Sequence, residues 1–119
     1  MNAKKVVYND YDKLIGDSFL SLDQTLGLFI TLKWQKGTFL YFDVNETETF
    51  QIFYQEEALY LIEIANDSED MVYLQKFADG EQVQSLIQYY FEHQVVSTDG
   101  FYAVPIETKT LSDVIRETN

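Results

Sequence analysis

The residues of this chain that could carry out chemistry are its carboxylates and one histidine. The 119-residue sequence contains 20 Asp and Glu, a single His and no Cys. The lack of cysteine excludes disulfides, thiolate metal ligands and cysteine nucleophiles. A Ser-His-Asp mechanism would have to use His93, yet the sequence has no Gly-x-Ser-x-Gly turn. His93 lies near the end of an expected helix, where its charge interacts favourably with the helix dipole, so we expect no catalytic role.

Other catalytic and cofactor patterns are also missing from the sequence. Glycoside hydrolysis needs two carboxylates at a fixed separation in a cleft, and a large number of acids does not supply that geometry. The five glycines are isolated, so neither of the glycine-rich phosphate-binding motifs occurs. The acidic segment 66–70 lacks the ordered ligand spacing of a calcium loop. We therefore expect a protein that is not an enzyme and that needs no cofactor and no metal.

Glu63 differs from the other acids because it interrupts a strongly apolar segment. A buried carboxyl group at this position would have a raised pKa. The alternative is a place on a sheet edge that faces water, and we expect this second arrangement.

The acidic residues are concentrated in the middle of the chain. The formal net charge is −12, and residues 38–107 contain fourteen acids and one base, Lys76. A field of one sign and this size repels nucleic acids and anionic lipids and attracts basic partners. We therefore expect a basic protein partner, no direct binding of nucleic acid and no membrane association. The alternative is that the acids serve only to keep the protein soluble.

Length and composition predict one folded domain over residues 1–119. Hydrophobic residues make up 46% of the chain and aromatic residues 16%, which is enough apolar surface to form a core. The sequence contains no repeat and no linker rich in Gly or Pro. Its first residues have no apolar run of the signal-peptide kind, so we expect a cytoplasmic protein.

Alternating and β-rich segments predict a fold of the α+β class with an antiparallel meander sheet of about five strands. The expected strands are 26–34, 38–44, 49–55, 58–65 and 71–77, and residues 35–37 are read as a tight hairpin turn between the first two. Ser21 and Gln24 fit a capping box, so a helix that begins there competes with the first half of the first strand. A short helix is also expected somewhere between Asp12 and Gln24. Residues 101–106 can form one more short strand.

Two helices are expected in the C-terminal half. The first is expected over residues 79–94, because Asp79 and Gln82 fit a capping box at its start. This helix would pack on one face of the sheet. Its apolar stripe consists of Val83, Leu86, Ile87, Tyr90 and Phe91. A final helix is expected over 110–117, with Leu111, Val114 and Ile115 facing inward.

Strand alternation predicts that both faces of the sheet are apolar. One face would hold Leu40, Phe42, Phe50, Ile52, Tyr60, Ile62 and Ile64, and the other Phe39, Tyr41, Phe53, Leu59, Leu61 and Tyr73. The helix 79–94 can cover the first face. The second must be covered by the terminal segments, by a second copy or by a partner, and we favour core packing over an interface. Phe39, Tyr41, Phe53 and Tyr73 form the secondary candidate surface for binding.

The meander also brings acidic loops together. Hairpin connections alternate between the two ends of an antiparallel sheet, so segments 45–48 and 66–70 should emerge at the same end. The candidate partner-binding residues there are Asp43, Glu46, Glu48, Asp67, Glu69 and Asp70. Mutual repulsion in this cluster is easiest to understand if a cationic partner offsets it. A plain solvated loop end and a divalent-cation site are the alternatives.

The order of elements between Phe50 and His93 resembles that of the small immunity proteins that accompany bacterial polymorphic toxins, in particular the Imm1-like domains. The segments that carry the resemblance are FQIFY at 50–54, LYLIEI at 59–64, MVY at 71–73 and EQVQSLIQYYF at 81–91. The resemblance implies a bacterial protein with an acidic or aromatic surface that plugs the active site of a toxin.

These observations lead us to expect a non-enzymatic acidic inhibitor. It would be an immunity or antitoxin-like protein, monomeric or homodimeric, that neutralises a basic toxin or nucleic-acid enzyme by occupying its active-site cleft. The alternative is a small regulatory or ligand-binding sheet domain that dimerises through its aromatic face. A phage-encoded DNA mimic shares the charge argument and differs in its target.

Overall fold

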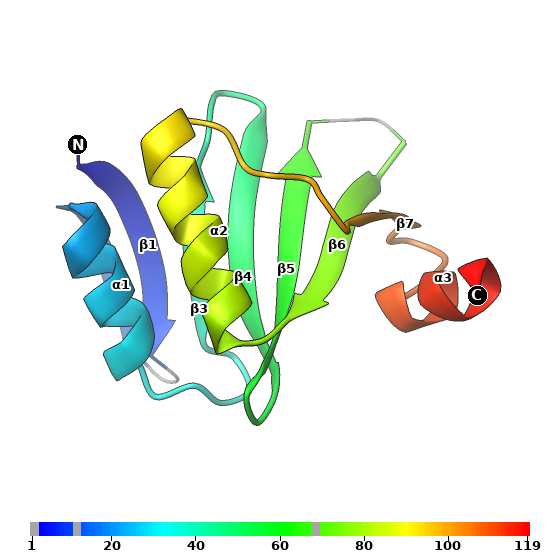
Figure 1. Ribbon diagram of the computed structural model, residues 1–119, viewed down its shortest axis with the longest axis horizontal. Helices are drawn as coiled ribbons and strands as arrows, with labels where there is room; N and C mark the ends of the chain where they lie inside the picture. Colours follow the sequence, from blue (N-terminus) through cyan, green and yellow to red (C-terminus); the bar gives the residue numbers. More distant parts are fainter. Residues whose placement is uncertain (1–2, 11–12, 68–69) are drawn as a thin grey trace.

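A computed structural model describes residues 3–10, 13–67 and 70–119 and shows one seven-stranded antiparallel sheet with three helices (Figure 1). The strands are β1 (Lys4–Asp10), β2 (Lys13–Leu20), β3 (Phe39–Asp43), β4 (Glu48–Glu56), β5 (Leu59–Asn66), β6 (Val72–Ala78) and β7 (Tyr102–Pro105). The helices are α1 (Leu22–Thr31), α2 (Gly80–His93) and α3 (Leu111–Thr118). The order of strands across the sheet is β2-β1-β3-β4-β5-β6-β7.

The predicted meander is confirmed for its last four strands. β3, β4, β5 and β6 follow one another in sequence and in the sheet, and each pairs with the next in antiparallel fashion. Phe50 lies opposite Phe42 on one side and opposite Ile64 on the other. Aromatic and β-branched residues favour this half-buried pleated surface, and polar residues occupy the turns that separate the strands.

The strand expected over residues 26–34 is wrong, because this segment belongs largely to α1. The capping box is present: the Ser21 hydroxyl accepts from the amide of Gln24 at 3.2 Å, and the Gln24 side chain accepts from the amide of Ser21 at 2.9 Å. Thr25, Phe29 and Leu32 are the buried positions. Their spacing is that of a helix, and the alternation in the sequence was ambiguous because apolar residues fill almost every position.

The hairpin turn expected at residues 35–37 is also wrong, since this segment connects α1 to β3. Gly37 has a positive φ of 97° there, a backbone conformation that favours glycine. The indole of Trp34 donates to the carbonyl of Phe29 at 2.8 Å and so ties the connection to α1.

Seven strands are present where about five were expected. The additional pair is the hairpin of β1 and β2, and β1 lies between β2 and β3. The short helix expected between Asp12 and Gln24 is wrong for residues 13–20, because they form β2 and α1 begins at Leu22. At the other edge, β7 pairs with β6 and confirms the short strand expected near residues 101–106. The helix expected at 110–117 is confirmed as α3, with a capping box between Thr110 and Asp113 and with Leu111 buried.

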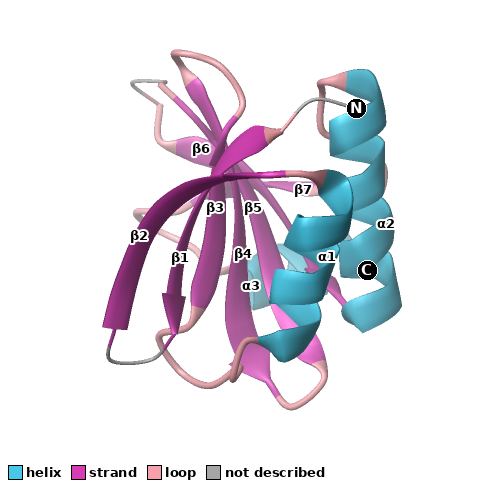
Figure 2. Cartoon of the chain, turned by 90° about the vertical axis from the view of Figure 1, so that its left-hand side faces the viewer, coloured by secondary structure: helices cyan, strands magenta, loops and turns pink. Residues whose placement is uncertain are grey.

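The core lies between one face of the sheet and the two longer helices. α1 and α2 lie side by side on this face (Figure 2). The capping box of α2 and its buried stripe match the prediction. The sheet residues beneath the helices are the predicted ones, and Leu40, Phe42, Phe50, Ile52 and Ile62 have no exposed surface. We call this surface the helix face.

The opposite surface, which we call the second face, has rows of side chains set by the strand register. One row is largely apolar and contains Phe39, Phe53, Leu61 and Phe77. The adjacent row is largely polar and contains Tyr41, Gln51, Glu63, Gln75 and Tyr102. The terminal helix α3 lies against β7 at one side of the second face and covers that part, while Phe39 and Phe53 stay half-buried.

None of the helices in the described part of the chain combines the length and the apolar character needed to span a bilayer.

Candidate functional site

The two acidic loops meet at one end of the sheet, as the meander predicts. Residues 44–47 connect β3 to β4, and the connection that follows β5 emerges beside them (Figure 1). The amide of Asp67 donates to the carbonyl of Thr47 at 2.8 Å, which joins the two loops directly. They enclose a shallow hollow of about 240 Å³ lined by Tyr41, Asp43, Asn45, Glu46, Thr47, Glu48, Thr49, Ala65, Asn66 and Asp67. We call it the acidic hollow.

Four of the six candidate partner-binding residues line the acidic hollow: Asp43, Glu46, Glu48 and Asp67. Asp70 is exposed and does not line it. Glu69 lies outside the described residues. Of the five candidates that the structure describes, the geometry therefore brings together four, drawn from β3, from β4 and from the two loops.

Local hydrogen bonds shape the loop between β3 and β4. The Asn45 side-chain oxygen accepts from the amide of Thr47 at 2.9 Å and from its hydroxyl at 3.0 Å. The amide of Val44 donates to the carbonyl of Glu48 at 3.0 Å. Asn commonly closes turns in this way, because its short side chain replaces a backbone acceptor. The carboxylates are thus carried on a loop with a defined backbone.

Tyrosines position one of the four carboxylates. The Tyr41 hydroxyl donates to Asp43 Oδ1 at 2.7 Å, and this hydrogen bond, followed by burial, raises the pKa of Tyr41. The hydroxyl of Tyr90, which belongs to α2, donates to the backbone carbonyl of Asp43 at 3.3 Å. Burial raises the pKa of Tyr90 as well. Both phenols therefore stay neutral donors at neutral pH and hold Asp43 at the rim of the hollow.

The charge of the acidic hollow is uncompensated within the part of the chain that the structure describes. No Lys or Arg lines the hollow, and none of its four carboxylates forms a salt bridge among the described residues. The same residues contain no group of three or more acids or histidines arranged to hold a metal ion. The hollow is suited chemically to cationic side chains, which can pair with carboxylates singly or, for Arg, in bidentate fashion.

The expectation that Glu63 lies on a sheet edge is wrong. β5 is an interior strand with β4 and β6 on either side, and Glu63 projects from it onto the second face, half-buried. Burial raises the pKa of Glu63, and a hydrogen bond from Gln75 acts in the opposite direction. In that bond Gln75 Nε2 donates to Glu63 Oε2 at 2.6 Å.

The four aromatic residues of the secondary candidate surface do not form one patch. The rings of Phe39 and Phe53 lie 6.5 Å apart, centroid to centroid, on neighbouring strands. Tyr41 belongs to the acidic hollow, and Tyr73 lies opposite Val104 on β7 and donates to the sulfur of Met71 at 3.7 Å. The aromatic candidates are thus divided among three parts of the second face.

Sequence reasoning missed a pocket between the second face and α3. Gln75 and Gln55 line it from the sheet, and Thr110 and Ser112 line it from the start of α3. Glutamine in a strand and hydroxyl residues near a helix cap are typical of solvent-facing positions, so no signal in the sequence distinguishes these four residues.

Comparison with known proteins finds no family model, no curated protein and no solved structure that matches this chain.

Proposed function

We propose that this protein is a non-enzymatic inhibitor that binds a basic protein partner through the acidic hollow, in the manner of an immunity or antitoxin-like protein. The partner would be a toxin or a nucleic-acid enzyme with a cationic active-site cleft. The observation that carries the proposal is that Asp43, Glu46, Glu48 and Asp67 surround one hollow that no Lys or Arg lines.

Like charges that line one hollow repel one another and lower the stability of the free protein. A cationic partner removes that cost when it binds. The cluster therefore contributes more to a complex than to the fold.

The shape and chemistry of the acidic hollow suit an inserted basic side chain. Carboxylate oxygens on several sides can accept the donors of a guanidinium group, and charge-assisted bonds of this kind are stronger than neutral ones. The Tyr41 ring, which also lines the hollow, offers an aromatic surface on which a guanidinium can stack. A cleft that normally binds phosphates presents such cationic groups. The carboxylates would occupy the positions of the phosphates and block substrate.

The long-range charge supports the same function. A formal net charge of −12 accelerates encounter with a cationic protein and makes the association rate fall as salt is added. Acids at the rim of an interface act mainly on that rate, whereas acids buried against the partner act mainly on dissociation.

The test compares two triple variants with the same change of charge. Glu46→Gln, Glu48→Gln and Asp67→Asn remove charge from the acidic hollow. The matched variant carries Glu56→Gln, Glu57→Gln and Glu81→Gln. It removes the same number of negative charges from the turn between β4 and β5 and from the start of α2, at the opposite end of the sheet (Figure 1). Each variant is titrated by calorimetry against the product of the gene adjacent to its own, at low and at moderate salt.

We expect the hollow variant to bind at least tenfold more weakly than wild type, which is about 1.4 kcal/mol, while the matched variant loses much less. Thermal stability of the hollow variant should be equal to or slightly above that of wild type, because repulsion is relieved. Equal affinities for the two variants, together with a flat salt response, would refute the proposal. Binding would then have to be sought on the second face outside the hollow, at the pair of Phe39 and Phe53.

A further inference from the structure

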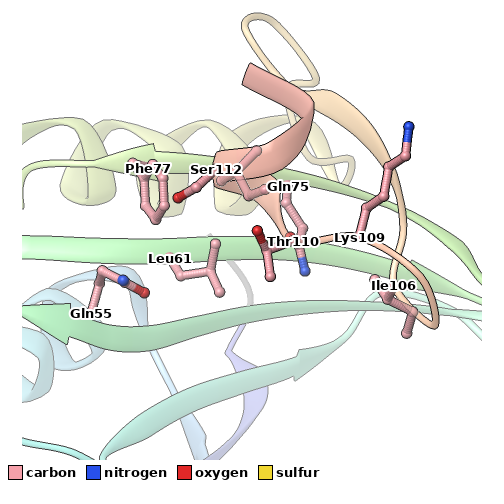
Figure 3. A pocket seen from close by; sticks show the side chains of 9 residues that line it. Gln55, Leu61, Gln75, Phe77, Ile106, Lys109, Thr110 and Ser112 are labelled. Atoms are coloured by element: carbon pink, nitrogen blue, oxygen red, sulfur yellow. The ribbon is translucent and has the colours of Figure 1, made fainter. Parts of the chain in front are cut away.

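The pocket between the second face and α3 has a volume of about 400 Å³ (Figure 3). Its sheet side consists of Gln55, Leu61, Gln75 and Phe77, and its other side of Ile106, Lys109, Thr110, Leu111 and Ser112. This volume lies in the range of pockets that hold small molecules. We call it the α3 pocket. It shares no lining residue with the acidic hollow.

Gln75 is the unusual member of the α3 pocket, since it is a polar side chain with only 7% of its surface exposed. Its Nε2 donates to Glu63 at 2.6 Å, which directs one amide hydrogen away from the pocket. Its carbonyl oxygen and its second amide hydrogen have no hydrogen-bond partner among the described residues. A buried amide with unused donor and acceptor is costly, so a ligand that supplies both would be favoured there.

The α3 pocket has one charged lining residue, Lys109. The ammonium of Lys109 is paired with Glu117 at 2.6 Å, and Figure 3 shows it directed away from Leu61 and Gln75. The remaining polar side chains are the amide of Gln55 and the hydroxyls of Thr110 and Ser112. This lining favours neither ion, because its one cation is already paired and points away from Gln75, and because no carboxylate lines the pocket.

Apolar side chains complete the walls of the α3 pocket. Leu61 and Phe77 project from neighbouring strands and lie opposite each other in the register. Leu111 contributes from the first turn of α3. A flat molecule with apolar faces can lie against these groups while its polar edge meets the amide of Gln75.

We propose that the α3 pocket binds a small uncharged planar molecule whose edge carries both a hydrogen-bond donor and an acceptor, the chemistry of an unphosphorylated nucleobase or nucleoside. A glutamine amide can pair with such an edge through two hydrogen bonds, as it does with adenine. Aromatic rings such as Phe77 are favourable surfaces for bases. A phosphate on the ligand would find no free cation in the pocket and would be repelled by the net negative charge of the protein.

The probes are adenosine, uridine and adenosine monophosphate, each titrated into the ¹⁵N-labelled full-length chain and followed by amide chemical shifts. We expect at least one nucleoside to give saturable shifts confined to strands β4, β5 and β6 and to residues 106–112. The monophosphate should bind more weakly than adenosine. No saturable shift with either nucleoside up to millimolar concentration, or tighter binding of the monophosphate, would overturn the proposal.

Three variants locate the binding. Gln75→Leu removes the amide and should weaken binding at least tenfold. Gln51→Leu, on the same polar row but outside the α3 pocket, is the matched control and should bind as wild type does. Ser112→Phe fills the pocket from an exposed position, and it should block binding even if Gln75→Leu proves unstable. Unchanged affinity in Ser112→Phe, or in a folded Gln75→Leu, would refute the assignment.

This proposal and the proposed function fail separately. The triple variant of the acidic hollow should bind nucleosides as wild type does, since none of its three changes lines the α3 pocket.

Discussion

The same strands form both faces of the sheet, but the two faces differ in how deeply their aromatic side chains are buried. On the helix face, Phe42 and Phe50 stack at 5.2 Å between centroids, and neither has exposed surface. On the second face, the cross-strand pair Phe39 and Phe53 lies at 6.5 Å and is half-buried. The residue type and the pairing are alike, but the burial differs because two helices cover one face and α3 covers only part of the other. Aromatic content alone therefore does not reveal which side of a sheet carries the stability.

The two faces also differ in polarity. The helix face buries Leu40, Ile52 and Ile62 completely, whereas the second face places Glu63 and Gln75 side by side in mid-sheet. A half-buried carboxylate lowers stability at neutral pH and is easier to understand on a surface that serves another purpose. The second face is thus a compromise between packing and polarity.

The largest expected effect separates the two faces directly. Phe50→Ala should lower the free energy of unfolding by about 3–5 kcal/mol, because it leaves a cavity under α2. Phe53→Ala, on the same strand, should cost less than about half as much, because water already reaches its ring. Urea titrations of both variants measure the difference. Similar losses would mean that the second face is covered in solution, for instance by a second copy.

A smaller effect concerns the helices on the two faces. Asp79→Ala removes the cap of α2 and should lower global stability by about 0.5–2 kcal/mol.

Thr110→Ala removes the equivalent cap of α3. Since α3 packs mainly on the edge strand β7, its loss should appear as faster amide hydrogen exchange within α3 and little change in the global transition. Equal global losses would show that α3 unfolds together with the core.

The smallest effect is a pH dependence that arises from Glu63. Burial raises the pKa of Glu63 in the folded state, so the neutral acid is the form that folding favours. Its stabilising contribution is complete below the unfolded-state pKa and is lost as the pH rises through the folded-state pKa.

Glu63→Gln keeps a neutral side chain at every pH. It should therefore be more stable than wild type at pH 7, and the advantage should shrink toward about pH 4. Thermal melts across this range measure it. Glu57→Gln, at an exposed turn position, is the control and should keep the shape of the wild-type profile. A constant difference between Glu63→Gln and wild type at all pH values would contradict the burial of Glu63.

The central strands and α2 were predictable because their signals are local. Phe39 to Phe77 alternates between strand-forming segments and polar turns, and Asp79 with Gln82 forms a complete capping box. The convergence of Glu46 and Asp67 followed from the alternation of hairpin ends. Each of these inferences used only residues that are close together in the sequence and the general rule for hairpin connections.

The remaining features depend on contacts between distant segments. Residues 4–20 carry no clear alternation, so the hairpin of β1 and β2 was missed. Leu26 to Leu32 fits a strand and a helix equally well, and the burial of Thr25 and Phe29 against other elements is what selects the helix. Gln75 acquires its importance when α3 docks near it, which no local pattern in the sequence reports.

The position of β1 has a consequence for the order in which the fold is assembled. β3 to β6 can pair as successive hairpins with short loops, whereas β1 joins the sheet through β3, with Val6 opposite Phe42 and α1 between them in the sequence. Closing that longer loop costs more entropy, so the pairing of β1 with β3 should form late during refolding. During synthesis, in contrast, the residues of β1 and β2 are made before those of β3. Their hairpin can therefore form before β3, the strand that pairs with β1, has been translated. The nascent N-terminal segment therefore has an unpaired edge until the middle of the chain has been translated.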